Sequence, residues 1–561
     1  MDILSDWNAR CKGPWDRDEL AEVVAHAYFY GQNSPGCDSY AARIADFEII
    51  PDDVAQSIID SGHRPSIHVA PGRISNTVDR AEKALLAAET PLYVHAMRLV
   101  RPVTDETQAA AGKRTKTVRL HAVTTSGLLD LMARAAIWTK TDARSKGRRV
   151  RINPPKEVAD MLLSRVGEWR FPTLAGIISA PTMRPDGTIL DQPGYDAATG
   201  LLLAHPPAMA PIPDHPSREE ALAALATLGG LLDGFPFADD ASRSVALSAL
   251  MTPVVRGCMD VAPLHAIRAP APGTGKSYLV DLVSALASGD RAPVIGAGQS
   301  LEELEKRLNT AMLDGQAIIA LDNVNGKLGG DALCQAIERP RVKVRILGKT
   351  VAPEVVNHAT IYATGNNLTL FGDVVRRALV CSLDANVERP ERRVSKSEPL
   401  DDILADRGRY IAAVLTIVRA YQAAGSPSPQ PRLASFGTWS DRVRSALVWL
   451  GCADPINTMQ TAYDDDPTDA AVREVCAAWQ EAIPAAEFLP ARQLAEIANG
   501  EDAATMVAND NFKQALLAVA ADRSGHMVDA KGLGYWLRDV QGRIVDGHKI
   551  VARRDGHRKQ Q

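Results

Sequence analysis

The residues best suited to chemistry form one short segment, PAPGTGKS, from Pro270 to Ser277. Gly273 and Gly275 permit a backbone bend that turns successive N–H groups toward phosphate oxygens, and the helix expected after them presents its positive N-terminus to the same anion. Lys276 would reach the β- and γ-phosphates of ATP, and Ser277 would hold Mg²⁺. Proline stands at 270, where the general motif has its first glycine, but a strand is expected over 264–268 and a helix over 278–287, as a phosphate-binding loop requires. The predicted nucleotide-binding residues are Pro272, Gly273, Thr274, Gly275, Lys276 and Ser277.

A carboxylate at the tip of a second apolar strand is the next candidate. The run AIIALDN, 317–323, has the pattern of a buried strand and ends in Asp322, 46 residues after Lys276. We expect Asp322 to bind Mg²⁺ through its water shell. Asn323 follows, at the place where most such ATPases carry a glutamate that polarises the attacking water. Because an amide cannot take a proton, either another residue acts as the base or hydrolysis depends on positioning and on Asp322 itself.

Two further polar groups follow along the chain. The segment TIYATGNN, 360–367, is typical of another strand, and Asn366 at its tip is expected to sense the γ-phosphate if this strand neighbours the loop strand. Arg376 and Arg377 come ten residues later, where an arginine would neutralise a γ-phosphate held by a neighbouring subunit. Surface salt bridges are the competing interpretation of this pair. The predicted catalytic residues are Lys276, Asp322, Asn323, Asn366, Arg376 and Arg377.

The elements around these residues predict an α/β protein. Short apolar strands alternate with helices up to about residue 384, which favours a parallel sheet, and the proline-dense stretch 206–217 cannot continue a helix. A helix over 401–423 and another over 439–450 suit a lid, and the last helices precede two short strands around turns. The predicted organisation is a helical linker-like module (1–64), an N-terminal α+β domain (65–205), a Pro-rich linker (206–217), a P-loop ATPase core with a parallel sheet (218–400), a helical lid (401–450) and a C-terminal winged-helix-like domain (451–561).

Longer segments resemble a known family. The short interval from phosphate loop to arginine pair and the TGNN tip look like the superfamily 3 version of the AAA+ core. The run RILGKTVAPEVVNHATIYATGNNLTLFGDVVRRALVCSLD resembles the helicase part of phage and prophage primase-helicases. The resemblance implies a DNA helicase of phage or mobile-element replication that works as a homo-oligomeric, hexameric ring. The opening residues look like the piece that follows a primase domain, so we expect a separately encoded primase.

The same resemblance implies a hairpin that projects into the channel of the ring. Residues 341–349, RVKVRILGK, fill that interval, and alternation puts cations on one strand face. Lys343, Arg345 and Lys349 are the predicted contacts to single-stranded DNA, because cations that line a channel track phosphates without reading sequence. A solvated strand face explains the pattern equally well. A basic tail suggests a duplex contact beside the C-terminal domain, and a frayed terminus that is merely soluble explains it equally well: its cations are Lys549, Arg553, Arg554, Arg558 and Lys559.

Composition limits the alternatives. The net charge of −5 argues against a protein that coats nucleic acid over its whole surface, so any DNA contact must be local. The seven cysteines show no CxxC pair and favour neither a zinc site nor a disulfide frame. The sequence has no apolar run long enough for a bilayer and no signal peptide, so we expect a cytoplasmic protein without a membrane partner. Two other functions stay open: an AAA+ switch, such as an origin-binding initiator or a defence component, and a scaffold with weak ATPase activity.

Overall fold

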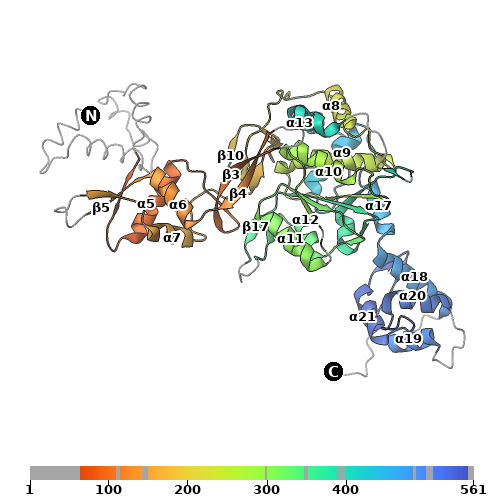
Figure 1. Ribbon diagram of the computed structural model, residues 1–561. Coiled ribbons are helices and arrows are strands. Elements are labelled where there is room, and N and C mark those ends of the chain that lie inside the picture. The colour runs from red at the N-terminus through yellow and green to blue at the C-terminus, as the bar shows by residue number, and fades with distance from the viewer. Residues whose placement is uncertain are drawn as a thin grey trace, which may run out of the picture. The chain divides into compact units, whose positions relative to one another are not determined.

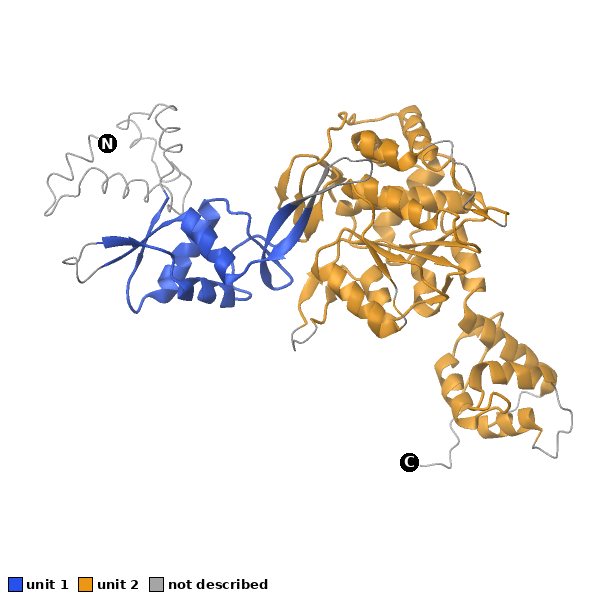
Figure 2. Cartoon of the chain, in the orientation of Figure 1, with its two compact units in different colours: residues 1–105, 118–174 blue, residues 106–117, 175–561 orange. Residues whose placement is uncertain are grey.

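The computed structural model describes residues 64–553 apart from 109–113, 142–148, 297, 299, 347–351, 388, 391–397, 484–487 and 501–509, and leaves the side chains of 105–117 undescribed. The expected helical module, 1–64, therefore lies outside the described residues except for Arg64. The chain divides into two compact units, residues 1–105 with 118–174 and residues 106–117 with 175–561 (Figure 2).

Between residues 64 and 174, the described part of the first unit combines two small sheets with three helices. Strand β1 pairs in parallel with β5, which pairs antiparallel with β6, and β2, β3 and β4 form the other sheet. One apolar core, with Trp138 at 2% exposure, joins the helices to the first sheet. The elements are β1 (Ser66–Val69), α5 (Ile74–Ala87), β2 (Tyr93–His95), β3 (Arg98–Gln108), β4 (Arg114–Ala122), α6 (Thr125–Ala135), β5 (Ile137–Thr141), β6 (Arg149–Ile152) and α7 (Lys156–Ser164).

A five-stranded parallel sheet forms the centre of the second unit. Its order is β13 (Val294–Gly296), β14 (Ile318–Asp322), β18 (Thr360–Asn366), β12 (Leu264–Ala269) and β20 (Ala378–Ser382). The four strands after β13 are buried almost throughout, as expected of a parallel sheet with both faces covered. The sheet is covered on one face by α9 (Asp240–Val254) and α10 (Lys276–Ser288) and on the other by α11 (Leu301–Leu313) and α12 (Asp331–Glu338) (Figure 1). The predicted α/β class with a parallel sheet is confirmed.

Small strands precede this sheet within the second unit. Strand β11 (Leu201–Leu203) pairs with β10 (Gly194–Asp196) and β7 (Gly176–Ile178), and β8 (Thr182–Met183) pairs with β9 (Ile189–Leu190). Arg407 also donates a hydrogen bond of 3.0 Å to Ser179 Oγ. Residues 175–205, expected in the N-terminal domain, therefore group with the second unit.

The helices after the sheet differ from the expected single helix over 401–423. Helix α13 (Pro399–Ala405) ends at Asp406, whose side chain accepts a hydrogen bond from Arg409 N and starts α14 (Arg407–Ala423). Helix α14 packs on α8 (Arg218–Gly230), which begins with a capping box between Ser217 and Glu220. The stretch expected as a helix over 439–450 forms α15 (Gly437–Trp439), a π-helical turn (Ser440–Arg444) and α16 (Ser445–Trp449).

The last part of the chain is a helical module with a short β-ribbon. Helix α17 packs on β20 and leads into the module, whose other four described helices share one apolar core around Phe512 and Leu516. A smaller apolar cluster packs the ribbon against the module through Val545. The elements are α17 (Asn457–Asp464), α18 (Pro467–Ala482), α19 (Ala491–Asn499), α20 (Asp510–Ala520), α21 (Ala530–Val540), β21 (Ile544–Val545) and β22 (His548–Lys549). The winged-helix assignment stays a prediction.

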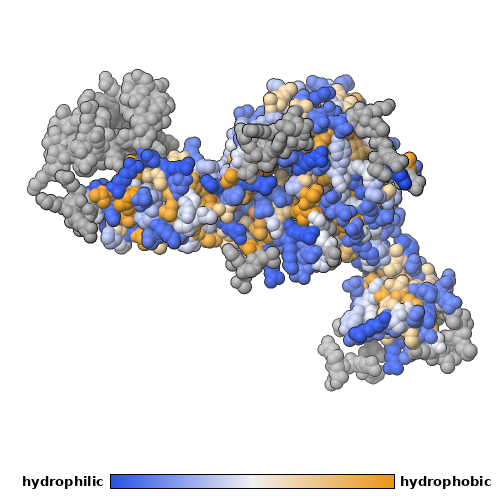
Figure 3. Space-filling view, viewed as in Figure 1, coloured by the Kyte–Doolittle hydropathy of each residue, from blue (hydrophilic) through white to orange (hydrophobic). Residues whose placement is uncertain are grey.

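Much of the visible surface is hydrophilic, with apolar residues scattered over it (Figure 3). Among the described residues, no helix combines the length and the apolar character that crossing a bilayer requires.

Candidate nucleotide site

The loop between β12 and α10 has the geometry of a phosphate cradle. Gly273 and Gly275 adopt φ values of 76° and 99°, in the left-handed region that favours glycine. A Cβ on Gly275 would also lie 3.1 Å from Cε1 of Phe235, so a side chain at this position would press on that ring as well as strain the backbone. Helix α10 starts directly at Lys276 and directs its N-terminus at the loop. The structure therefore places Pro272, Gly273, Thr274, Gly275, Lys276 and Ser277 in a strand–loop–helix, as predicted.

Lys276 is folded back onto its own loop. Its Nζ donates hydrogen bonds to Ala271 O (3.0 Å) and to Thr274 Oγ1 (3.2 Å). Burial lowers the pKa of this ammonium, and the negative charge of Asp322 partly offsets that effect. A phosphate oxygen would give this buried ammonium a direct anionic partner, in addition to the negative charge of Asp322.

Three strand ends meet at the loop. Ala269, the last residue of β12, pairs with Asn366 at the end of β18, and β14 runs on the other side of β18. Asp322 at the tip of β14 accepts a hydrogen bond of 2.7 Å from Ser277 Oγ. The condition set for Asn366, that its strand neighbours the loop strand, is met. Carboxyl ends of adjacent parallel strands are where open α/β sheets bind ligands.

Thr364 is a residue of this cluster that the sequence did not single out. Its hydroxyl donates to the Asp322 carboxylate and accepts a hydrogen bond of 3.2 Å from Asn323 N. It thereby fixes the carboxylate and the turn after it. The signal was present in the sequence, because Thr364 stands two residues before Asn366 and so shares its face of the strand.

The two asparagines face the loop in different ways. Asn323 is exposed and has a φ of 53°, a left-handed conformation that asparagine tolerates better than most residues. Oδ1 of Asn366 is buried and has no hydrogen-bond partner within the described part of the chain. A buried carbonyl oxygen normally has a partner, so water or a bound ligand is required to complete it. A water poised for attack on a phosphate fits this requirement.

The donor set suits a hard divalent cation. Ser277 contributes a hydroxyl and Asp322 a carboxylate, and Mg²⁺ prefers oxygen ligands of this kind and keeps several of its waters. The site therefore fits Mg²⁺ held by Ser277 and by the water shell at Asp322.

The arginine pair lies at the amino-terminal ends of the strands, opposite the end of the sheet that carries the phosphate loop. Arg377 directly precedes Ala378, which pairs with Leu264 at the start of β12, whereas the phosphate loop follows the end of β12. Five residue steps along β12 separate these two ends of the sheet by about 17 Å. Within one chain the pair is thus not brought to the nucleotide site, which is the arrangement expected of residues that serve a neighbouring subunit.

The two arginines have different environments. Arg377 is 5% exposed and donates a hydrogen bond of 2.7 Å to Glu338 Oε2. Arg376 keeps 41% of its side chain exposed and contacts Asp373 Oδ1 at 2.9 Å. Hydrogen bonds from Arg376 and then Arg377 lower the pKa of Asp373 to about 2. Arg376 is therefore the arginine that another subunit can reach, and Arg377 is an internal ion-pair partner.

The hairpin expected to contact DNA is formed by β16 (Arg341–Lys343) and β17 (Glu354–Val356). Val342 and Val344 are buried while Lys343 and Arg345 are exposed, so the alternation holds. Lys349 lies outside the described residues.

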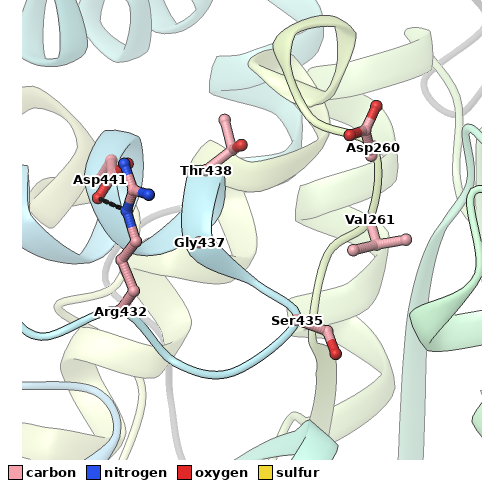
Figure 4. Close-up of a pocket in the computed structure, with 7 residues that line it drawn as sticks. All are labelled: Asp260, Val261, Arg432, Ser435, Gly437, Thr438 and Asp441. Carbon is pink, nitrogen blue, oxygen red and sulfur yellow. Dashed lines mark hydrogen bonds and ion pairs between the residues drawn. The ribbon is translucent and has the colours of Figure 1, made fainter.

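A polar pocket of about 160 Å³ lies away from the loop, at the other end of β12 (Figure 4). Arg432 and Asp441 form an ion pair of 2.8 Å across one side of it. Its lining consists of Asp260, Val261, Arg432, Ser435, Gly437, Thr438 and Asp441. Because Asp260 and Val261 precede β12 while the phosphate loop follows it, the pocket is separate from the nucleotide site.

No family model and no curated protein matches the chain. Among solved structures, it is similar to the apo C-terminal region of NrS-1, at 12% identity and a TM-score of 0.34, covering 77% of this chain and 90% of that one. It is similar to the active helicase Cch of SCCmec type IV, at 11% identity and a TM-score of 0.32, covering 81% and 94%. A JCV helicase structure follows at 12% identity and a TM-score of 0.19, covering 46% and 72%. The fold and the loop define a P-loop nucleotide-binding core.

Proposed function

We propose that the protein is an ATP-dependent DNA helicase or translocase of phage or mobile-element-type replication, acting in the cytoplasm as a homo-oligomeric ring. One observation carries the proposal. The phosphate loop is surrounded by the polar side chains of Ser277, Asp322, Thr364 and Asn366, while the arginine pair lies at the other end of the strands of the same sheet. A site built in this way is complete only when a second subunit supplies an arginine.

Each residue then has a role in hydrolysis. The loop N–H groups hold the phosphates, and Lys276 exchanges its contacts with Ala271 and Thr274 for phosphate oxygens. Mg²⁺ at Ser277 and Asp322 supplies charge neutralisation on the phosphates. Asn366, with its unpartnered oxygen, orients the attacking water or senses the γ-phosphate. Asn323 helps to position the reacting groups and does not accept a proton, because an amide cannot act as a base.

Arg376 completes the site of the neighbouring subunit. It is the exposed member of the pair, and its charge would stabilise the negative charge that develops on the transferred phosphoryl group. Because every subunit both offers and receives such an arginine, the contact is head-to-tail and closes as a ring, in our proposal a hexamer.

DNA is the substrate that the ring moves along. Lys343 and Arg345 project from the hairpin as exposed cations beside buried valines, and Lys349, outside the described residues, is a third proposed contact. Such a row attracts the phosphates of a single strand without reading bases. A separately encoded primase would act on the strand that the ring exposes.

A strand-displacement assay on forked DNA, combined with steady-state ATPase rates with and without single-stranded DNA, tests the function. We expect unwinding that needs ATP and a rate that DNA stimulates. Lys276→Ala should abolish both, while Lys306→Ala, which removes an exposed lysine that pairs with Glu302 on α11, should change neither. Turnover without strand separation would reject the helicase.

A second candidate, an AAA+ switch such as an initiator or a defence component, is favoured by one residue. Asn323 provides no base beside Asp322, and slow hydrolysis suits a protein that assembles on ATP and disassembles after one turnover. Oligomer mass with and without ATP, measured beside the displacement assay, separates the two functions. A switch assembles with ATP and separates no strands.

A further inference from the structure

Two exposed aromatic rings of the C-terminal module each have an arginine stacked on them. The guanidinium of Arg538 lies 4.7 Å from the ring centre of Tyr535 on α21, and that of Arg553 lies 5.6 Å from the ring centre of Phe488, just before α19. Tyr535 is 57% exposed and Phe488 is 55% exposed, even with a guanidinium against each ring. Large aromatic residues normally bury most of their surface, so two such rings call for an explanation.

Packing of the module does not account for this exposure. Helix α21 turns Leu533 and Val540 into the apolar clusters, and the core has its own aromatic pair in Trp479 and Phe512, whose ring centres are 6.4 Å apart. Tyr535 lies on the side of α21 away from Leu533. The fold therefore gains little from an aromatic residue at 535.

The two stacks lie on neighbouring parts of the module. The start of α19 contacts α21, since a Cβ on Gly534 would lie 3.6 Å from Cβ of Ala491. Tyr535 follows Gly534 directly, and Phe488 is three residues before Ala491. Three residues of extended chain span at most about 11 Å, so the backbone that carries Phe488 is near the contact between α19 and α21.

The charges around the rings favour an anionic ligand. Arg538 uses its Nε to hydrogen-bond Gly534 O at 3.0 Å, which leaves both terminal nitrogens available. Lys531, one turn before Tyr535 on α21, is exposed, and no ion pair to Lys531, Arg538 or Arg553 occurs within the described residues. The nearby Asp529 caps α21 by accepting from Lys531 N and Gly532 N, and Asp539 is the one other acid within α21.

We propose that this surface, Tyr535, Arg538, Phe488, Arg553 and Lys531, binds single-stranded nucleic acid. Unpaired bases stack on the two rings, and the arginine and lysine side chains contact the adjacent phosphates. A duplex would present phosphates and groove edges but no free base face, so the rings would contribute little to its binding.

This inference extends the proposed function, because it gives the strand a second contact outside the channel hairpin. It does not depend on hydrolysis. A protein that binds single strands here but shows no ATPase activity would contradict the proposed function and leave the inference standing.

Fluorescence anisotropy of a labelled 20-nucleotide oligo-dT, measured on the full chain without nucleotide, tests the proposal. The measurement is made with Lys343→Ala and Arg345→Ala in place, so that hairpin contacts do not mask the module. We expect Tyr535→Ala and Phe488→Ala each to weaken binding roughly fivefold to a hundredfold, as loss of one base stack does, and Tyr535→Phe to retain it. Arg538→Gln and Arg553→Gln should also flatten the salt dependence of the affinity.

Tyr463→Ala, which removes another exposed aromatic residue (41% exposed) from α17, is the matched control and should bind as the parent does. A duplex of the same length is measured beside the single strand. Equal losses for duplex and single strand would assign the surface to duplex DNA, and unchanged affinity in Tyr535→Ala and Phe488→Ala, with unfolding temperatures preserved, would overturn the proposal. No oligo-dT binding in the chain that lacks both hairpin cations would overturn it as well.

Discussion

Ser277 Oγ and Asp322 Oδ1 are joined by a hydrogen bond of 2.7 Å that links the first turn of α10 to the tip of β14. Both oxygens are ligands suited to Mg²⁺, and the hydroxyl of Thr364 donates a second hydrogen bond to the same carboxylate oxygen, Asp322 Oδ1. The contact keeps the two donors together before a cation binds between them.

Removing either donor should therefore change the dependence on Mg²⁺. We expect Ser277→Ala to raise the Mg²⁺ concentration for half-maximal ATPase activity roughly 10- to 100-fold, and Asp322→Asn to abolish measurable turnover. Ser277→Thr keeps the hydroxyl and should behave as wild type. Mg²⁺ titrations at fixed ATP check this, and identical curves for the alanine and threonine variants would speak against a ligand role for Ser277.

Replacing Arg376 and Arg377 by alanine should have different effects on stability and on ATPase activity. Arg377→Ala removes from the carboxylate of Glu338, 17% exposed, the nearer of its two arginines, so we expect a loss of about 3 kcal/mol in unfolding free energy. Arg376→Ala removes a half-exposed side chain and should leave the unfolding temperature unchanged while it lowers ATPase activity. Denaturation and turnover of both variants provide the comparison.

Mixing tests whether Arg376 acts on a neighbour. Neither Lys276→Ala nor Arg376→Ala should hydrolyse ATP well alone, but a mixed ring contains interfaces with an intact Lys276 on one side and an intact Arg376 on the other. Partial activity of the mixture is the expected result. A mixture no more active than its components would remove the role in trans.

The buried strands and the position of their polar ends are the part of the fold that the sequence predicts well. Apolar runs that end in Asp322 or Asn366 indicate buried parallel strands, and the polar residues at their carboxyl ends must lie at the same end of the sheet. Thr364 was not predicted, because a threonine inside a strand is ordinary until its partners are known. The burial of Arg377 depends on Glu338, 39 residues away in the sequence, and local patterns carry no information about such a contact.

Helix boundaries were also harder to predict than the helices themselves. The periodicity over 401–423 is helical on both sides of Asp406, yet the structure breaks there into α13 and α14. Asp406 satisfies an N–H of the second helix with its side chain, and this competition between capping and helix continuation is decided by tertiary packing. The apolar period indicates which residues are helical but not where one helix ends.

Asn323 is suited to a gain-of-function test. Its φ of 53° is also accessible to aspartate, so Asn323→Asp should preserve the turn and place a carboxylate beside Asp322. If the natural site lacks a base, we expect turnover to rise about tenfold or more, with a rate that falls at acidic pH as the new carboxylate is protonated. Asn323→Gly keeps the left-handed backbone without the carboxylate and should be no faster than wild type. Equal pH profiles for the three proteins would show that base catalysis does not limit the rate.

His265 on β12 should make the core sensitive to acid. The ring is fully buried, hydrogen-bonds Ser248 Oγ at 3.0 Å and stacks on Tyr362, and burial lowers its pKa from 6.5 to about 3. Between those values the unfolded chain binds a proton that the folded one excludes, so stability is complete above pH 6.5 and falls as pH decreases toward 3. From pH 7.5 to pH 5 the loss should be about 2 kcal/mol. Urea denaturation at both pH values should show a smaller difference for His265→Gln, whose side chain does not titrate; an equal difference in the two proteins would mean that other groups cause the acid sensitivity.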